Sequence, residues 1–377
     1  MIIAYLFFFF YNLHKVLCDD IISIPIAKET NPYQSEFAVK DLYWKIKFNI
    51  NMGIEYTYLN KGLFKRFQQY NEQTVSVVIK NNSFVTNTYN TDLSFGGHTL
   101  KDYFFVIIPE KQYVRNSGSI GLSYKVSNTS FIMRLFQEGL IQHLTFCFYH
   151  YDKDNYISFG GLPPQLISKK SKAVTSVDDR DIFWGIKLTE FYFGDRKFNY
   201  INDKYAFINV DNDRIFAPDN VMDHIANTVF SDYIANKTCR YNQKKRRQYI
   251  NCQCLPMRYF PNMTFVIDGY LIVFTAKELF LTIQSKSNCL FLIQRSFEEG
   301  DENMWYFGNY FLSRFDTEFN YDEHTITFYS DEEIQMRTYE YKRYIKYSLS
   351  IVISVSIVAI ILTIYNLCYI NKQIGKY

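Results

Sequence analysis

The hydrophobic and polar residues of this chain alternate in short runs that end at Gly or Asn. A two-residue period is typical of half-buried β-strands, and these runs are rich in Tyr, Phe, Ile and Val, which favour strands. Helical periodicity is brief and confined to residues 130–140 and 219–230. We therefore expect an all-β fold with short helices, with strands in segments that include residues 45–51, 74–80, 102–108, 145–151, 183–188 and 264–274.

Two longer apolar segments interrupt this pattern at the ends of the chain. Residues 1–18 contain an apolar stretch of the length of a signal-peptide core, and Val16 and Cys18 suit cleavage. Residues 347–370 carry no charged side chain and are long enough to cross a bilayer as a helix. Together they predict a single-pass membrane protein of the secretory pathway, with a lumenal or extracellular N-terminal ectodomain.

The length of 377 residues allows two compact lobes in that ectodomain, with a linker near Lys169. We predict a signal peptide at residues 1–18, a short N-terminal segment at 19–42, a first lobe at 43–172, a second lobe at 173–330, a juxtamembrane segment at 331–346, a transmembrane helix at 347–370 and a cytosolic tail at 371–377.

The net charge of the chain is only +3. No basic face recurs with interleaved aromatic residues, so the sequence does not indicate nucleic-acid binding. A basic run at residues 244–247 is explained by a solvated hairpin tip, by a processing site or by a contact with an anionic surface.

Five cysteines lie between the two terminal apolar segments: Cys147, Cys239, Cys252, Cys254 and Cys289. Cys147 occupies an inward position of an alternating run, so we expect a buried free thiol there. The other four can form two disulfides in the second half, since the predicted compartment is oxidising. Four glycosylation sequons agree with this route, at Asn81, Asn128, Asn236 and Asn262.

Two stretches place an Asn directly after an apolar strand residue. These are Leu59-Asn60 in YTYLNKGLF and Ile208-Asn209 in YAFINVDNDRIFAP. Polar side chains at the end of a packed strand are well positioned for chemistry, although similar stretches also form ordinary solvated turns. Their repetition in the two halves favours one site to which each half contributes.

Several segments, in order along the chain, resemble the pepsin-like aspartic peptidases. Residues 305–328, WYFGNYFLSRFDTEFNYDEHTITF, are similar to the family pattern W-I-L-G-D-x-F-L-R-x-Y-Y-x-V-F-D-x-x-N-x-x-I-G-F. Residues 117–124 resemble D-G-I-L-G-L-x-Y, and residues 135–161 resemble the helix end, Q-G-L-I turn and F-G-G strand of the family. Residues 75–97 align with its flap hairpin. The resemblance implies a bilobal pepsin-like β fold that holds neither a cofactor nor a metal ion.

In that family each lobe supplies one catalytic Asp, from a D-T-G-S/T motif that follows an apolar strand residue. The resemblance places Asn60 and Asn209 at these two positions, facing each other across the lobe interface. An amide cannot take a proton at physiological pH, so neither residue can act as a general base. In the flap, Ile79 stands where the family has Tyr, and a glycan on Asn81 would lie at the flap tip.

The resemblance also implies a Cys254–Cys289 disulfide, which leaves Cys239 to pair with Cys252. We predict a membrane-anchored homologue that does not cleave peptides and whose ectodomain binds a peptide or protein or serves as a scaffold. The alternative is an active aspartic endopeptidase that uses a shifted carboxylate, such as Asp211 or Asp213.

Overall fold

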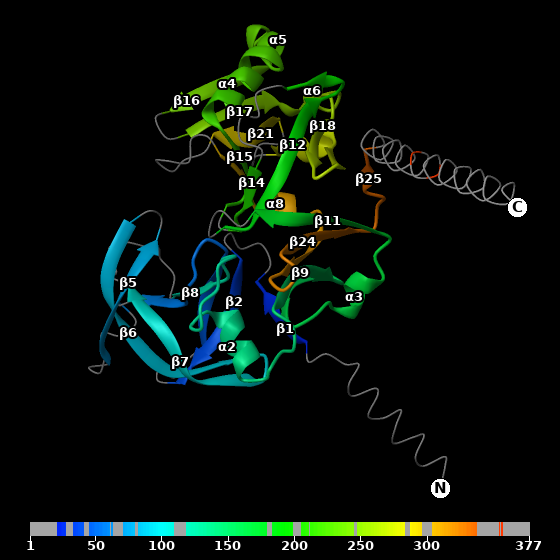
Figure 1. Cartoon of the computed structure of the whole chain (residues 1–377). Helices are drawn as coiled ribbons and strands as arrows, with labels where there is room; N and C mark the ends of the chain where they lie inside the picture. The colour runs from blue at the N-terminus through cyan, green and yellow to red at the C-terminus, as the bar shows by residue number, and fades with distance from the viewer. Residues whose placement is uncertain are drawn as a thin grey trace, which may run out of the picture.

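The computed structural model describes residues 21–27, 33–40, 45–60, 62, 71–79, 82–108, 118–178, 183–198, 205–210, 212–244, 247–282, 287–295, 304–337, 354 and 356. Within these ranges the chain forms strands throughout, with a few short helices, which confirms the mostly β fold predicted from the alternating pattern. The strands build two lobes and a sheet that both lobes share (Figure 1).

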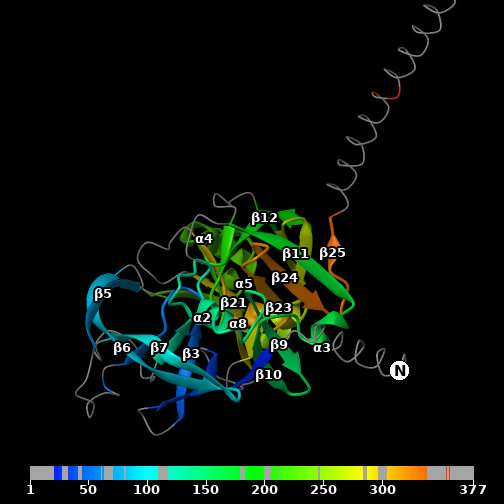
Figure 2. The same cartoon turned by 60° about the horizontal axis from the view of Figure 1, so that its bottom comes forward.

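The first lobe is built on a seven-stranded sheet. Its order is β2 (Gln34–Val39), β3 (Lys45–Asn51), β8 (Gly118–Gly121), β4 (Tyr58–Asn60), β7 (His98–Ile108), β6 (Asn82–Phe95) and β5 (Asn71–Ile79). Strands β5 and β6 form the hairpin expected at the flap, and β6 turns into β7 at Gly96 and Gly97. In Figures 1 and 2 this β5–β6–β7 meander lies on the side of the molecule away from β11, β24 and β25.

The shared sheet interleaves strands from the two halves of the chain. Its antiparallel order is β1 (Ile22–Ile26), β10 (Asp154–Phe159), β9 (Thr145–Tyr151), β23 (Asp316–Asn320), β24 (Thr325–Ser330) and β11 (Ser171–Asp178). Strands β1 and β2 lie before residue 43, so the described β-structure begins earlier than the predicted first lobe. Strand β11 leads from this sheet into the second lobe, where the linker was expected.

The second lobe contains the remaining strands. They are β12 (Gly185–Phe193), β13 (Arg196–Lys197), β14 (Tyr205–Ile208), β15 (Ile215–Ala217), β16 (Cys239–Lys244), β17 (Arg247–Gln253), β18 (Met263–Ile267), β19 (Tyr270–Phe274), β20 (Phe280–Thr282), β21 (Asn288–Arg295), β22 (Trp305–Phe307) and β25 (Gln335–Met336). The helices of the chain are α2 (Phe131–Gln137), α3 (Pro164–Ile167), α4 (Asp219–Thr228), α5 (Ser231–Ala235), α6 (Cys254–Met257), α7 (Ala276–Leu279) and α8 (Asn309–Leu312).

Aromatic side chains join the lobes to the shared sheet. Phe146 of β9 stacks on Phe319 of β23, with ring centroids 4.7 Å apart. Trp184, at the start of the second lobe, is fully buried, and its ring centroid lies 5.1 Å from that of Phe319 and 4.7 Å from that of Tyr321. Large buried rings contribute most to core stability, so this contact fixes the second lobe on the shared sheet.

The predicted terminal segments are not tested by the fold. Residues 1–18 lie outside the described residues, as does the segment 347–370 apart from Ser354 and Ser356. No helix among the described residues is both long enough and apolar enough to span a bilayer.

The cysteines follow the prediction in part. Cys239 and Cys252 stand opposite each other in the β16–β17 hairpin and form a disulfide, as predicted. Cys147 is a buried free thiol, also as predicted. The Cys254–Cys289 bridge is not present, and both residues are free thiols.

Cys254 and Cys289 lie within hydrogen-bond reach of each other, but strand register does not pair them. Strand β17 places Cys252, rather than Cys254, opposite Cys289 of β21. Cys254 already begins α6, and its backbone N–H donates to the carbonyl of Ser287. Burial raises the pKa of the Cys289 thiol to about 12, and the hydrogen bond to the Cys254 side chain adds to the shift.

Replacing the two bridged cysteines, Cys239→Ser with Cys252→Ser, should lower the free energy of unfolding by about 3 kcal/mol, because the bridge closes a loop of intermediate length. Cys254→Ser is the matched control, with an expected change below about 1 kcal/mol that does not depend on reductant. Denaturant unfolding with and without reductant measures both. A Cys254→Ser loss as large as that of the double variant would show a second bridge.

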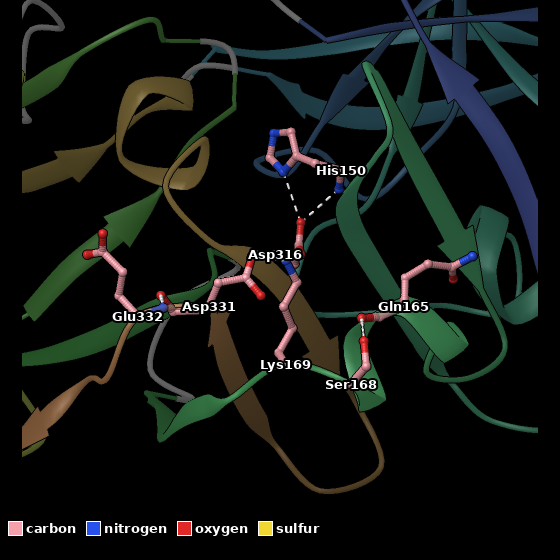
Figure 3. A network of polar contacts seen from close by, with 8 residues as sticks. His150, Gln165, Ser168, Lys169, Asp316, Asp331 and Glu332 are labelled. Carbon is pink, nitrogen blue, oxygen red and sulfur yellow. Dashed lines mark hydrogen bonds and ion pairs between the residues drawn. The ribbon is translucent and has the colours of Figure 1, made fainter.

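A buried carboxylate of the shared sheet contacts the segment that leads into β11 (Figure 3). Asp316 of β23 is 3% exposed and accepts hydrogen bonds from the backbone N–H of His150 at 2.7 Å. Its other oxygen lies 3.0 Å from Nζ of Lys169, which also contacts Asp331 at 2.8 Å. Burial acts to raise the pKa of Asp316, but the hydrogen bonds from His150 and Lys169 outweigh it and lower that pKa.

A depressed carboxyl pKa stabilises the fold above the ordinary pKa of Asp, and this contribution is lost as the pH falls through the folded value. Asp316→Asn should therefore lower the free energy of unfolding by about 1–3 kcal/mol at pH 7, and the difference from the wild type should vanish in strong acid. Thermal unfolding as a function of pH measures it. Asp331→Asn is the control, because Asp331 contacts the same Lys169 but its side chain is 73% exposed. Equal effects of the two substitutions would contradict the assignment.

Candidate active-site region

In the first lobe, two short strands, β3 and β4, pair with the two edges of one central strand, β8. Strand β3 runs parallel to β8, and its last residue, Asn51, pairs with Gly121. After a tight loop the chain returns as β4, antiparallel to the same strand, with Tyr58 opposite Ser119. The loop from Asn51 to β4 therefore begins and ends at residues that pair with β8.

The second lobe repeats this arrangement. Strand β14 runs parallel to β22 with Ile208 opposite Phe307, so the next residue, Asn209, follows in register. Strand β15 returns antiparallel to β22, with Phe216 opposite Tyr306. The two strand sets are equivalent, and their registers can be compared residue by residue.

The comparison makes Asn51 the counterpart of Asn209. Tyr58 then matches Phe216, because each is the strand residue opposite the middle of the central strand. Asn60 ends β4 and matches Pro218, which follows β15. The strand register therefore makes Asn51, rather than Asn60, the residue equivalent to Asn209. The sequence had predicted Asn60 at this position.

The first stretch was misplaced because its local pattern occurs twice. Ile50-Asn51 and Leu59-Asn60 both put Asn after an apolar strand residue. Both are also followed two residues later by a glycine, Gly53 or Gly62. The signal that distinguishes them is the second strand that follows Asn51 and ends at residue 60, as Asn209 is followed by β15.

Asn51 is 7% exposed and is held at both ends. Its side-chain Oδ1 accepts a hydrogen bond from the N–H of Gly53 at 2.9 Å, and its backbone carbonyl accepts from the N–H of Leu122 at 2.8 Å. Asn209 is half-buried, and its N–H donates to the carbonyl of Phe307 at 3.0 Å. Asn60 makes a separate local turn, in which its Oδ1 accepts from the N–H of Gly62.

Trp184 connects the two loops directly. Its indole Nε1–H donates to the carbonyl of Leu122, the residue bonded to Asn51, at 2.9 Å. Its backbone carbonyl accepts from the N–H of Ile208, the residue before Asn209, also at 2.9 Å. The neighbouring Phe183 ring lies so close to Gly53 that a Cβ there would be 2.5 Å from it. Both loops therefore contact the same dipeptide, Phe183-Trp184.

Glycine is also required at or just after the end of each central strand, where the loop packs against it. A Cβ on Gly121 would lie 2.4 Å from the carbonyl oxygen of Ile54, and one on Gly308 would lie 2.4 Å from that of Arg214. Real Cβ atoms do not approach backbone oxygen this closely, so the same steric limit operates in both lobes.

These features place the chain among known proteins. It matches the family model of the eukaryotic aspartyl proteases over residues 69–330. The chain belongs to this family.

A solved structure supports the same fold. The aspartic proteinase from Irpex lacteus superposes with a TM-score of 0.65 at 13% sequence identity, covering 82% of this chain and 97% of that chain. No curated protein sequence matches the chain. The Asn51 loop precedes the matched residues 69–330, so its equivalence rests on strand register alone.

The residues that follow each Asn differ from the D-T-G pattern of the aspartyl proteases. Met52 and Val210 stand where the pattern has Thr, and both are fully buried in the main core. Ile54 follows Gly53 and belongs to a small separate apolar cluster. None of these three side chains carries a hydroxyl, so none can donate a hydrogen bond to a carboxylate or amide beside it.

Carboxylates do occur near both loops, at equivalent distances along the chain. Glu55 lies four residues after Asn51, and Asp213 lies four residues after Asn209. Asp213 is 51% exposed in its side chain and forms an ion pair with Nε of Arg214 at 3.3 Å. Asp211 lies outside the described residues.

The flap and the sequons complete the predicted set. Ile79 pairs with Asn82 at the end of the β5–β6 hairpin, and Asn81, which was predicted at the flap tip, lies outside the described residues. The other sequon residues, Asn128, Asn236 and Asn262, are exposed and could accept a glycan. Among the described residues there is no cluster of His, Cys, Asp or Glu that could hold a metal ion.

Proposed function

We propose that this aspartyl protease homologue does not hydrolyse peptides and that its ectodomain binds a peptide or protein segment. The observation that carries the proposal is the matched register of Asn51 and Asn209, which puts a neutral amide at the equivalent point of each lobe. In the family these two points carry the catalytic Asp pair.

Hydrolysis by an aspartic peptidase needs two carboxylates that share one proton. One accepts a proton from the attacking water while the other protonates the substrate, and their mutual repulsion keeps one of them protonated. An amide neither accepts nor supplies that proton at ordinary pH. Loss of one general base costs roughly 10² to 10⁴ in rate, and here the acid is missing as well.

The two loops remain well built for holding a ligand. Each is flanked by an apolar cluster distinct from the main core: Ile54, Tyr58, Val77, Val106 and Ile108 in the first lobe, and Phe207, Phe216 and Tyr306 in the second. Apolar walls with a few fixed polar groups are typical of ligand sites. The Oδ1 of Asn51 accepts a hydrogen bond from the N–H of Gly53 at 2.9 Å, which fixes the orientation of this amide.

The proposal includes a cellular setting. The apolar segments 1–18 and 347–370 support a secretory route and a single-pass membrane anchor, with the lobes on the lumenal or extracellular side. Exposed sequons at Asn128, Asn236 and Asn262 are compatible with this route.

The alternative is an active endopeptidase with shifted carboxylates. The equivalent placement of Glu55 and Asp213 favours it, since a symmetric pair is what the chemistry requires, and Asp211 is a further candidate in the second loop. The ion pair of Asp213 with Arg214 argues against it, because this carboxylate is already engaged by the neighbouring guanidinium and half of its side chain is exposed to solvent.

The full chain should not cleave an unfolded protein substrate at any pH from strongly acid to neutral. Asn51→Asp with Asn209→Asp should restore little cleavage, because Met52 and Val210 beside them carry no hydroxyl that could donate a hydrogen bond to the new carboxylates. Adding Met52→Thr with Val210→Thr should raise the rate at least tenfold above that of the double variant. Product release, followed by mass spectrometry across the pH series, measures all three.

Two controls separate the proposal from its alternative. Cleavage by the wild type that a transition-state-like inhibitor of aspartic peptidases blocks, and that Glu55→Gln or Asp213→Asn abolishes, would establish the shifted enzyme and overturn the proposal. Binding of the same inhibitor without cleavage would support a ligand-binding cleft over a pure scaffold.

A further inference from the structure

The end of the second lobe that carries α5, α6 and the β16–β17 hairpin has an unusual charge distribution. Between Asp232 and Asp268 the sequence contains no acidic residue but seven Lys or Arg residues. Figure 1 shows these elements together at the top of the molecule, away from the first lobe. This surface is separate from the loops of Asn51 and Asn209.

Two large apolar side chains project from this basic region. Leu255 is 73% exposed and Tyr259 is 76% exposed, the highest values for large hydrophobic side chains in the described part of the chain. Leu255 lies in α6, and Tyr259 follows two residues after the end of this helix. The guanidinium of Arg258 lies 4.4 Å from the centroid of the Tyr259 ring, which restricts the ring in its exposed position.

Contacts beneath the surface bring two more cations to the same place. The N–H of Gln253 donates to the carbonyl of Thr238, and the Cys239 sulfur contacts that of Met257 at 3.9 Å. Lys237 and Arg240, which flank this pair, are exposed like Arg258. No ion pair between described residues involves any of the three. We call Lys237, Arg240, Leu255, Arg258 and Tyr259 the α6 patch.

The base of the α6 patch is rigid. The Cys239–Cys252 disulfide joins the two strands that lead to it. Phe260, next to Tyr259, is buried and stacks on Phe230 with ring centroids 4.9 Å apart. Exposed apolar side chains on a fixed support lose little conformational entropy on binding, which favours a role in recognition.

We infer that the α6 patch docks an acidic segment of a partner protein that packs an apolar side chain against Leu255 and Tyr259. Tyr, Arg and Leu at the centre with Lys and Arg around them provide an apolar anchor and charge complementarity for carboxylates. Asp232 on α5 and Asp195 on the β12–β13 turn are exposed at its margin and limit the basic surface there.

A flat anionic membrane would use the same charges, but the sequons disfavour it. Asn236 is adjacent to Lys237, and Asn262 lies three residues after Tyr259, so glycans would stand on two sides of the α6 patch. Both Asn residues are exposed. A narrow peptide segment can lie between two glycans, whereas a bilayer has to displace them.

The test uses the full chain in phosphatidylcholine nanodiscs and three fluorescent 12-residue peptides. The first is Glu-rich with a central Leu-Phe, the second has Lys in place of Glu, and the third has Ser-Ser in place of Leu-Phe. We expect the first peptide to bind at least tenfold more tightly than either of the others, and binding to weaken as salt rises from 50 to 300 mM, because salt screens exposed charges.

Variants assign that binding to the patch. Leu255→Ser with Tyr259→Ser, and separately Arg240→Gln with Arg258→Gln, should each weaken the first peptide at least tenfold. Val85→Ser with Ile167→Ser is the matched control, since those side chains are 71% and 69% exposed elsewhere, and should leave it unchanged. Circular dichroism of each variant establishes that the fold is intact.

Three outcomes would overturn the inference: equal binding of the three peptides, unchanged binding by the two patch variants, or no peptide binding together with patch-dependent binding to phosphatidylserine vesicles. The last outcome would assign the surface to a membrane. None of these outcomes bears on catalysis, so the result is independent of the proposed function.

Discussion

The arrangement of the two lobes depends on one buried side chain, Trp184. Its indole N–H has a single hydrogen to donate, and it donates it to the carbonyl of Leu122 in the first lobe. Its backbone carbonyl accepts from Ile208 in the second lobe, while its ring packs on Phe319 of the shared sheet. A buried donor left without its acceptor is costly, so the lobes cannot separate at this point without losing that bond. The loops of Asn51 and Asn209 are fixed relative to each other as a consequence.

The backbone of the two loops does not depend on which side chains they carry. The steric limits at Gly121 and Gly308 act through backbone oxygens, and they hold whether the loop carries a carboxylate or an amide. The side chains of the loops obey other constraints. Met52 and Val210 are buried in the core, where an apolar residue packs without needing a hydrogen-bond partner. The fold of the loops and the chemistry of their side chains therefore depend on different atoms.

The sequence predicted what strand alternation and long motifs determine. The β fold, the hairpin of β5 and β6 and the segment from Trp305 to Phe328 all followed from patterns that extend over many residues. The Cys239–Cys252 bridge was expected only because the resemblance paired Cys254 with Cys289, and that pairing was wrong. Errors arose where a short pattern fits two places. Leu59-Asn60 and Ile50-Asn51 are locally alike, and only the pairing of β3 with β8 distinguishes them. Cys252 and Cys254 are likewise two residues apart, and the register of β17 against β21 decides which faces Cys289. Register is a long-range property, so local composition could not supply it.

The amides of the two loops also bear on how acid affects this molecule. Two carboxylates side by side repel each other, and protonation relieves that repulsion. Asn51 and Asn209 carry no charge and do not respond to acid in this way, whereas two carboxyl groups of the shared sheet have shifted pKa values. There the hydrogen bonds of Asp316 lower its pKa, while burial raises the pKa of its strand neighbour Glu318, which accepts a hydrogen bond from Tyr329. Folding stability from Asp316 is lost as the pH falls, whereas protonation of Glu318 removes the cost of a buried charge and adds stability. The two groups oppose each other on one strand, which limits how far acid can shift the stability of the sheet that holds the lobes together.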